Sequence, residues 1–119
     1  MENKDHLVQF SIPQLLRWRV ETTGEKVALR EKDFGCWNSY TWNQYYDRVR
    51  KAGLGLRKIG FQKDDKIAII SDNIPETLYM AIGGQAVGGV SSAIYQTSLP
   101  DEIGGILNYL GVTIVFCND

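Results

Sequence analysis

This chain of 119 residues contains little histidine and cysteine, and its net charge is close to zero. Its single histidine, His6, excludes a zinc site built on several histidines and a Ser–His–Asp triad around a folded pocket. Its two cysteines, Cys36 and Cys117, form neither a metal-ligand pattern nor a disulfide framework, which favours a reduced, intracellular setting. The formal net charge of -1 gives no basic field for a phosphate backbone, so we expect no nucleic-acid partner.

A long hydrophobic run is also lacking. Residues Thr77–Pro100 contain no Asp, Glu, Lys, Arg or His, but glycines and polar side chains interrupt them, so the segment cannot be a membrane span. Such a segment can be buried without desolvating a charge, and we expect it in the middle of an α/β sheet. The opening residues MENKDH carry charges of both signs and lead into no apolar segment, so we expect no signal peptide and a cytoplasmic location.

The length and an apolar content of 44% suit one compact domain. We expect residues 1–10 to be a flexible tail and residues 11–119 to form a partial α/β domain. Ser11 and Gln14 make a capping-box pattern, which predicts a helix as far as about Thr22. Residues 27–30 and 36–41, with turn-forming residues between them, predict a β-hairpin.

The strongest periodicity follows Thr41, where apolar residues recur every three or four positions from Trp42 to Ile59. This predicts an amphipathic helix that ends before Gly60. Gly53 and Gly55 lower its intrinsic stability and suggest close approach to another backbone. We interpret the aromatic residues as core, or as a surface covered by another part of a larger protein, and not as a base-stacking platform: Trp37, Tyr40, Trp42, Tyr45 and Tyr46.

From residue 66 onward the pattern is strand, helix, strand, helix, strand. Apolar strands are predicted at 66–70, 90–95 and 112–116, and the intervening helices begin near Asn73 and Ser98. Connections of this length favour parallel pairing through right-handed crossovers. The expected fold class is therefore α/β, with a partial parallel sheet, helices on its faces and an N-terminal β-hairpin.

Three polar clusters follow the three predicted strands: residues 71–73, 95–98 and 117–119. Parallel pairing would bring them to one edge of the sheet, where ligands of open α/β sheets bind. For Asp72, Asn73, Thr97 and Ser98 we favour helix capping as the main role, although a capped helix N-terminus can also bind an anion. The pairs Gly83-Gly84 and Gly88-Gly89 lack the strand–glycine loop–helix order of a phosphate loop, so we assign them to packing and turning.

Several short motifs occur together in an ordered series, from the strand sequence ALR at 28–30 to the segment Ile-Tyr-x-Thr-Ser at 94–98. Between these lie G-x-W-x-x-YTW at 35–42, a helix end at 55–60, Asp-x-Ile-Ala-Ile at 65–69 and Asn-x-Pro-Glu at 73–76. In this order and spacing they resemble the N-terminal region of bacterial long-chain acyl-CoA synthetases, which belong to the AMP-forming adenylating superfamily. The resemblance extends from about Ile12 to Asp119.

This resemblance implies a two-step ligase in which a fatty acid and ATP give an acyl-adenylate and CoA then displaces AMP. It also implies that the phosphate loop, the magnesium-binding Glu, the ribose-binding Asp and the adenylation Lys of the parent enzyme lie outside this chain. We therefore expect an N-terminal fragment that is inactive alone, binds no cofactor by itself and has the remainder of the same protein as its partner. A fatty-acid substrate would bring the parent enzyme close to membranes.

The resemblance carries a role to only one segment, the loop after the second predicted strand of the sheet. There Tyr95, Gln96 and Thr97 correspond to residues near the approach of CoA. Gln96 stands where relatives often have Pro, and Thr77 stands where they often have Trp. Catalytic and metal-binding residues are not expected in this chain.

Three alternatives stay open at this stage. The chain is part of a ligase, or it is a freestanding α/β binding or interaction domain. The third, purely structural alternative is that the chain self-associates through surfaces that its missing remainder would cover, driven by exposed apolar patches and an open sheet edge.

Overall fold

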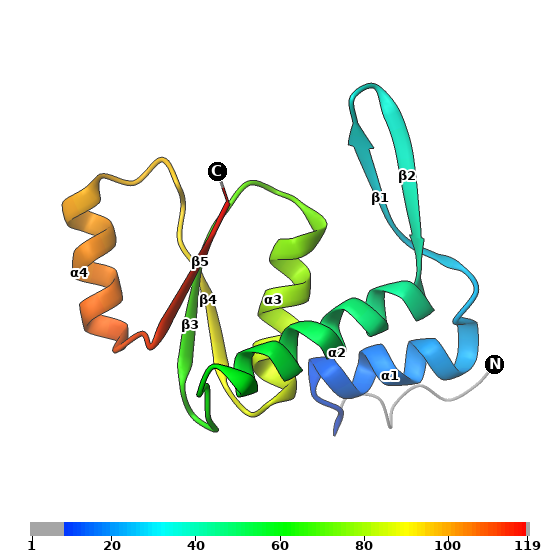
Figure 1. Ribbon diagram of the computed structural model, residues 1–119, viewed down its shortest axis with the longest axis horizontal. Coiled ribbons are helices and arrows are strands. Elements are labelled where there is room, and N and C mark those ends of the chain that lie inside the picture. Colours follow the sequence, from blue (N-terminus) through cyan, green and yellow to red (C-terminus); the bar gives the residue numbers. More distant parts are fainter. Residues whose placement is uncertain (1–8, 119) are drawn as a thin grey trace. The chain divides into compact units, whose positions relative to one another are not determined.

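The computed structural model describes residues 9–118, so residues 1–8 of the expected tail lie outside it. The chain forms two compact units, which divide within a helix between Arg48 and Val49. The first unit contains an antiparallel hairpin, and the second contains a parallel three-stranded sheet with helices (Figure 1). The expected α/β class with an N-terminal hairpin is confirmed.

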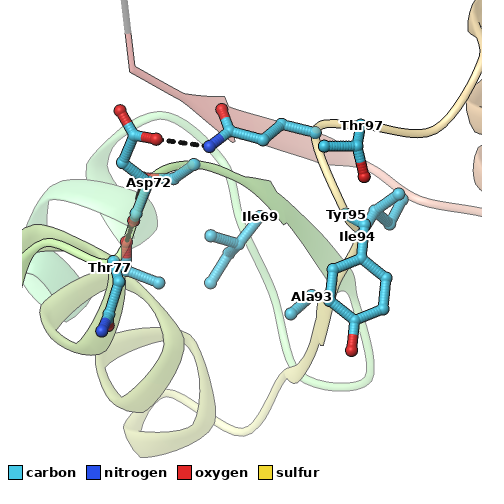
Figure 2. Close-up of a pocket in the computed structure, with 10 residues that line it drawn as sticks. Ile69, Asp72, Thr77, Ala93, Ile94, Tyr95 and Thr97 are labelled. Carbon is cyan, nitrogen blue, oxygen red and sulfur yellow. Dashed lines mark hydrogen bonds between the residues drawn. The ribbon is translucent and has the colours of Figure 1, made fainter.

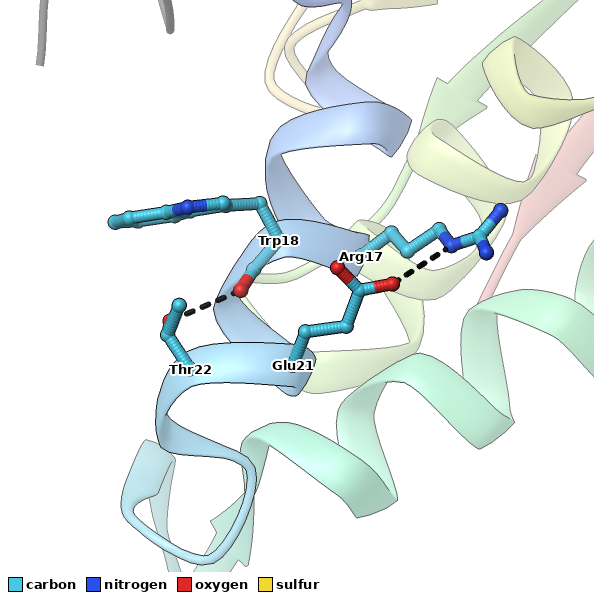
Figure 3. A network of polar contacts seen from close by, with 4 residues as sticks. All are labelled: Arg17, Trp18, Glu21 and Thr22. Atoms are coloured by element: carbon cyan, nitrogen blue, oxygen red, sulfur yellow. Dashed lines mark hydrogen bonds and ion pairs between the residues drawn. The ribbon is translucent and has the colours of Figure 1, made fainter.

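The first helix, α1 (Ile12–Thr23), starts where the capping-box pattern predicts it. The backbone N–H of Ser11 donates to Gln14 Oε1 at 2.8 Å, which satisfies a donor at the helix start. Along the exposed side of the helix, Arg17 Nε donates to Glu21 Oε1 at 3.1 Å, and the Thr22 hydroxyl donates to the backbone oxygen of Trp18 at 2.9 Å (Figure 3). The ion pair is exposed, so it contributes little to stability.

The hairpin consists of β1 (Val27–Asp33) and β2 (Cys36–Thr41). Asp33 pairs with Cys36, so the turn contains two residues, Phe34 and Gly35. Both have positive φ angles, 45° and 80°. The first strand is longer than predicted because its pairing continues to the turn.

The second helix, α2 (Trp42–Lys58), has the predicted capping box. The N–H of Thr41 donates to Gln44 Oε1 at 2.8 Å, and the N–H of Gln44 donates to Thr41 Oγ1 at 3.2 Å. The aromatic core interpretation holds for Tyr45, which is buried with its ring 5.9 Å from that of Trp42. Trp37 is exposed on the hairpin and is not part of the core, so for this residue the other alternative, a surface covered by another part of a larger protein, stays a prediction.

The second unit is built on a parallel sheet in the order β4-β3-β5. Its strands are β3 (Lys66–Ile70), β4 (Val90–Ala93) and β5 (Ile114–Cys117), joined by α3 (Pro75–Ala86) and α4 (Pro100–Leu110). The predicted parallel pairing is confirmed, with Ile67 opposite both Ser91 and Ile114. The core forms around the central strand and comprises Leu56, Phe61, Ile67 and Ile69.

Of the three apolar strands predicted from the sequence, only β3 has a run of fully buried residues. Val90 and Ala93 of β4 and Val115 of β5 are exposed. In the described part of the chain β3 alone has a strand on each side, so its neighbours each keep an open edge. The second strand also ends at Ala93 and not at Tyr95.

Close packing explains two of the glycines. A Cβ atom on Gly83 would lie 2.9 Å from the backbone nitrogen of Gly53 and 3.1 Å from the backbone oxygen of Val49, so α3 and the part of α2 from Val49 onward approach closely. A Cβ atom on Gly84 would lie 3.1 Å from Ile67 Cγ2, which confirms helix–sheet packing. The expectation for Gly55 is wrong, because nothing lies within 4 Å of the position of its Cβ.

Candidate functional site

The three polar clusters meet at one edge of the sheet, as parallel pairing predicts. Asp72 follows β3, Gln96 lies beyond β4, and Asn118 follows β5. Gln96 Nε2 donates to Asp72 Oδ1 (Figure 2), and Asn118 Nδ2 donates to Asp72 Oδ2 at 3.2 Å. The N–H of Asp72 donates in turn to Asn118 Oδ1 at 3.0 Å. Asp72 therefore connects the ends of all three strands, and we call these three residues the strand-end network.

The hydrogen bond from Gln96, followed by that from Asn118, lowers the pKa of Asp72 below its ordinary value, and the small effect of burial opposes this. Hydrogen bonds to an ionised acceptor favour the ionised form. The carboxylate of Asp72 therefore stays charged in more acidic solution than an isolated Asp would.

The capping roles predicted at Asn73 and Ser98 are wrong. The N-cap of α3 is Ile74 and that of α4 is Leu99, and neither makes a side-chain cap bond. Pro75 and Pro100 occupy the first turns, and a residue before proline is held in an extended conformation, which is the conformation of an N-cap. The side-chain carboxylate of Asp72 bonds across the strands, whereas its backbone oxygen accepts from the N–H of Ile74, the N-cap of α3, at 2.9 Å.

A cleft of about 500 Å³ opens beside the network (Figure 2). Its volume is in the range of small-molecule sites. Apolar side chains of β3 and of the end of β4 line it together with polar side chains of the following loops; the lining residues are Ile69, Ser71, Asp72, Asn73, Thr77, Ala93, Ile94, Tyr95, Gln96 and Thr97. All three residues expected near CoA are therefore in the lining, and the side chain of Tyr95 is 84% exposed.

The lining suits an uncharged group with amides and methylenes better than a phosphate. None of the described lining residues is basic, and the carboxylate of Asp72 would repel an anion. Within residues 9–118 no group of three His, Cys, Asp or Glu side chains is placed to hold a metal ion. The cleft therefore offers a ligand hydroxyl and amide groups, apolar side chains and one carboxylate.

Thr77 is a member of this site that sequence reasoning noted only as a departure from relatives. Its hydroxyl oxygen lies 3.0 Å from both Ser71 Oγ and the backbone oxygen of Asp72. Thr77 lies in the first turn of α3, so these contacts hold the connection between β3 and α3 against the start of that helix. Asp64 and Asp65 lie at the turn before β3, where Asp65 Oδ2 accepts a bond from the N–H of Gln62 at 2.7 Å.

Comparison with known proteins assigns the family. Residues 16–119 match the model of the AMP-binding enzymes. The chain belongs to this family. It is 31% identical over 110 residues to the long-chain-fatty-acid–CoA ligase ACSBG2 of Rattus norvegicus. The matched segment covers 92% of this chain and 16% of that protein. It is 32% identical over 91 residues to the ligase ACSBG1 of Bos taurus, covering 76% of this chain and 12% of that protein.

Solved structures show the same fold. The fatty acid AMP ligase from Legionella pneumophila superposes with a TM-score of 0.85 at 16% identity, covering 98% of this AMP-binding chain and 21% of that one. The N-terminal domain of FACL13 from Mycobacterium tuberculosis, in an inhibitor-bound crystal structure, gives 0.83 at 23% identity, covering 89% and 26%. The chain thus spans about a sixth or less of the two ligases and about a quarter or less of these two structures. Among residues 9–118, no helix is both long and apolar enough to cross a bilayer.

The strand-end network makes a pH-dependent contribution to stability that can be measured. Because the folded pKa of Asp72 is lowered, the unfolded chain binds more protons at acidic pH. The stabilisation is therefore present above the ordinary pKa of Asp and is lost as the pH falls through the lowered value. We expect Asp72→Asn to unfold at lower urea concentration than the wild type near pH 7, and the gap to close toward about pH 2.

A second variant that keeps the carboxylate, Gln96→Ala, removes the principal hydrogen bond to Asp72 and should lose part of the same pH-dependent stabilisation. A gap for Asp72→Asn that stays constant across this pH range would contradict the prediction.

Proposed function

We propose that this chain is the amino-terminal part of a long-chain fatty acid–CoA ligase. The enzyme would form an acyl-adenylate from a fatty acid and ATP and would then transfer the acyl group to CoA. The single observation that carries the proposal is the match of residues 16–119 to the AMP-binding enzymes, supported by relatives named as long-chain-fatty-acid–CoA ligases. We place the enzyme in the cytoplasm, near the membranes in which its fatty acids dissolve.

ATP and Mg²⁺ would be bound by other segments of the enzyme, because the cleft offers neither cations for phosphates nor a cluster of carboxylates for a metal. We therefore propose that the chain alone forms neither adenylate nor thioester. Its part in the enzyme is to provide the sheet and the cleft edge on which other segments of the same protein assemble.

Toward CoA, the chain would contribute Tyr95, Gln96 and Thr97. When bound, CoA supplies the thiol that displaces AMP. The exposed ring of Tyr95 offers an apolar surface, while the hydroxyl of Thr97 and the free oxygen of the Gln96 amide can bond to amide groups of the neutral arm. Because the nitrogen of Gln96 is held by Asp72, the loop would be positioned before the ligand arrives.

This role is tested in the protein that the whole coding frame specifies. We expect Gln96→Ala to raise KM for CoA about three- to tenfold, the loss of one hydrogen-bonding group. Fatty-acid-dependent exchange between ATP and pyrophosphate, which needs no CoA, should be unchanged. Tyr109→Ala, at an exposed position of α4, is the control. An unchanged KM for CoA, or a loss of exchange, would contradict the role.

A freestanding binding domain is the alternative function, favoured by the preformed cleft. Titration of the 119-residue chain with CoA, AMP and an acyl-adenylate analogue separates the two readings. Tight binding by the chain alone would favour the freestanding domain, and weak or absent binding would favour the partial site of a ligase.

We also propose that the chain self-associates when other segments do not cover it. The open strands β4 and β5 and exposed apolar side chains such as Leu99 and Val115 favour this. Light scattering should show association that increases with protein concentration. A monodisperse monomer at high concentration would contradict it.

A further inference from the structure

The tip of the β1–β2 hairpin carries a residue that local folding preferences do not explain. Phe34 has a φ of 45°, in the left-handed region, and its side chain is 99% exposed. The first position of such a two-residue turn ordinarily holds Asn, Asp or Gly, because a bulky side chain is strained there. Since no packing compensates the strain, Phe34 costs stability in two ways, and such a residue points to a function outside the fold.

Behind the tip, strand alternation separates the charges of the hairpin. Arg30 lies opposite Ser39, and Lys32 lies opposite Trp37, so all four share one face, which we call the basic face. The neighbouring residues Glu31 and Asp33 point to the other face, where Glu31 Oε2 accepts a bond from the hydroxyl of Tyr40 at 3.2 Å. The hairpin therefore presents cations on one side and carboxylates on the other, although its net charge is balanced.

The basic face also carries an open aromatic ring. The side chain of Trp37 is 67% exposed, and the ammonium nitrogen of Lys32 lies 5.9 Å from the centre of its ring. Arg30, Trp37 and Ser39 line a shallow hollow of about 220 Å³ on this face. A cation, a hydroxyl and an indole around one hollow match an anionic head group attached to an apolar chain.

We propose that the basic face and Phe34 together dock on the surface of an anionic lipid bilayer. Arg30 and Lys32 meet head-group phosphates, Trp37 lies at the interface, and the ring of Phe34 enters the acyl region. A bilayer receives a single protruding apolar side chain without a shaped pocket, whereas a protein partner would need one. The acidic face stays in water, and two cations with two rings give reversible binding that weakens with salt.

The experiment is vesicle flotation of the 119-residue chain. One set of vesicles contains phosphatidylcholine alone, and the other contains phosphatidylcholine with about one-third phosphatidylglycerol. We expect the chain to float with the anionic vesicles, to float much less with neutral ones, and to be released by added salt. Failure of the wild-type chain to float with anionic vesicles, or equal flotation with both sets, would overturn the proposal.

Two variants separate docking from misfolding. Phe34→Asn suits the left-handed conformation, so it keeps the hairpin and should lower the partition coefficient about tenfold or more by removing the ring. Arg30→Gln with Lys32→Gln should abolish the preference for anionic vesicles. The matched control on the opposite face, Glu31→Gln with Asp33→Asn, should bind equally or more tightly.

Flotation of either test variant like the wild type would overturn the proposal. So would a lipid-free association of the chain, seen by light scattering, that Phe34→Asn abolishes, because the tip would then contact a second copy. The result does not depend on ligase activity, so it stands or falls separately from the proposed function.

Discussion

Ile67→Ala is expected to lower the free energy of unfolding by about 2–5 kcal/mol, the usual range for truncating a buried Ile. Ile67 lies in the central strand, β3, and is 0% exposed. Leu56, Phe61 and Ile69 belong to the same core cluster. Removal of the side chain would leave a cavity that these neighbours fill only in part, since strands pair with β3 on both sides.

The measurement is urea unfolding followed by circular dichroism, with Ile59→Ala as the matched control. Ile59 is 70% exposed beyond the end of α2, so the same chemical change should cost well under about 1 kcal/mol there. Similar losses of unfolding free energy for the two variants would mean that β3 is not the centre of the core. The description of β3 as the strand that supports the cleft would then also be wrong.

Gly83→Ala is the second substitution with a large expected effect, a loss of about 1–3 kcal/mol. The new methyl group would lie 2.9 Å from the backbone nitrogen of Gly53 and 3.1 Å from the backbone oxygen of Val49. Backbone atoms inside a helix cannot move away as the end of a flexible side chain can. The two helical segments would therefore have to separate, and the better helix propensity of Ala would not compensate.

Gly55→Ala provides a control of opposite sign. Gly55 is also inside a helix, but nothing lies within 4 Å of its Cβ position. There the substitution should stabilise the chain by about 0.5–1 kcal/mol through helix propensity alone. If both substitutions stabilise the protein in thermal unfolding, the close approach of Gly53 and Gly83 is not real.

Much of the fold followed from local patterns. The sequence Lys66–Ile70 reads as a buried strand because it is nearly all apolar, and the order of elements after it permits little except parallel pairing. That pairing correctly predicted that residues 71–73, 95–98 and 117–118 would meet. Capping predicted α2 correctly because Thr41 and Gln44 satisfy each other locally.

The features that could not be predicted depend on the register of the strands and on the residues next to each position. The bond between Gln96 and Asp72 joins residues 24 positions apart and exists only in the observed strand alignment. The N-caps are Ile74 and Leu99, and not the predicted polar residues, because the prolines that follow them outweigh the preference for a polar cap. The turn at 33–35 was visible in the sequence, but the left-handed conformation of Phe34 was not, since Phe rarely adopts it.

The cleft and the strand-end network show how this chain would take part in the proposed function. The central strand is fixed by its core, Asp72 follows it, and Gln96 is held by Asp72 at the mouth of the cleft. In the proposed ligase, this chain would orient a ligand for chemistry that groups elsewhere in the enzyme perform.

Fatty-acid-dependent exchange between ATP and pyrophosphate tests the central claim most directly. It should be measured in parallel for the 119-residue chain and for the product of the whole coding frame. Exchange by the full product with a long-chain fatty acid, and none by the 119-residue chain, is the predicted result. A coding frame that ends at Asp119, exchange by the chain alone, or a full product without exchange for any fatty acid would contradict the account.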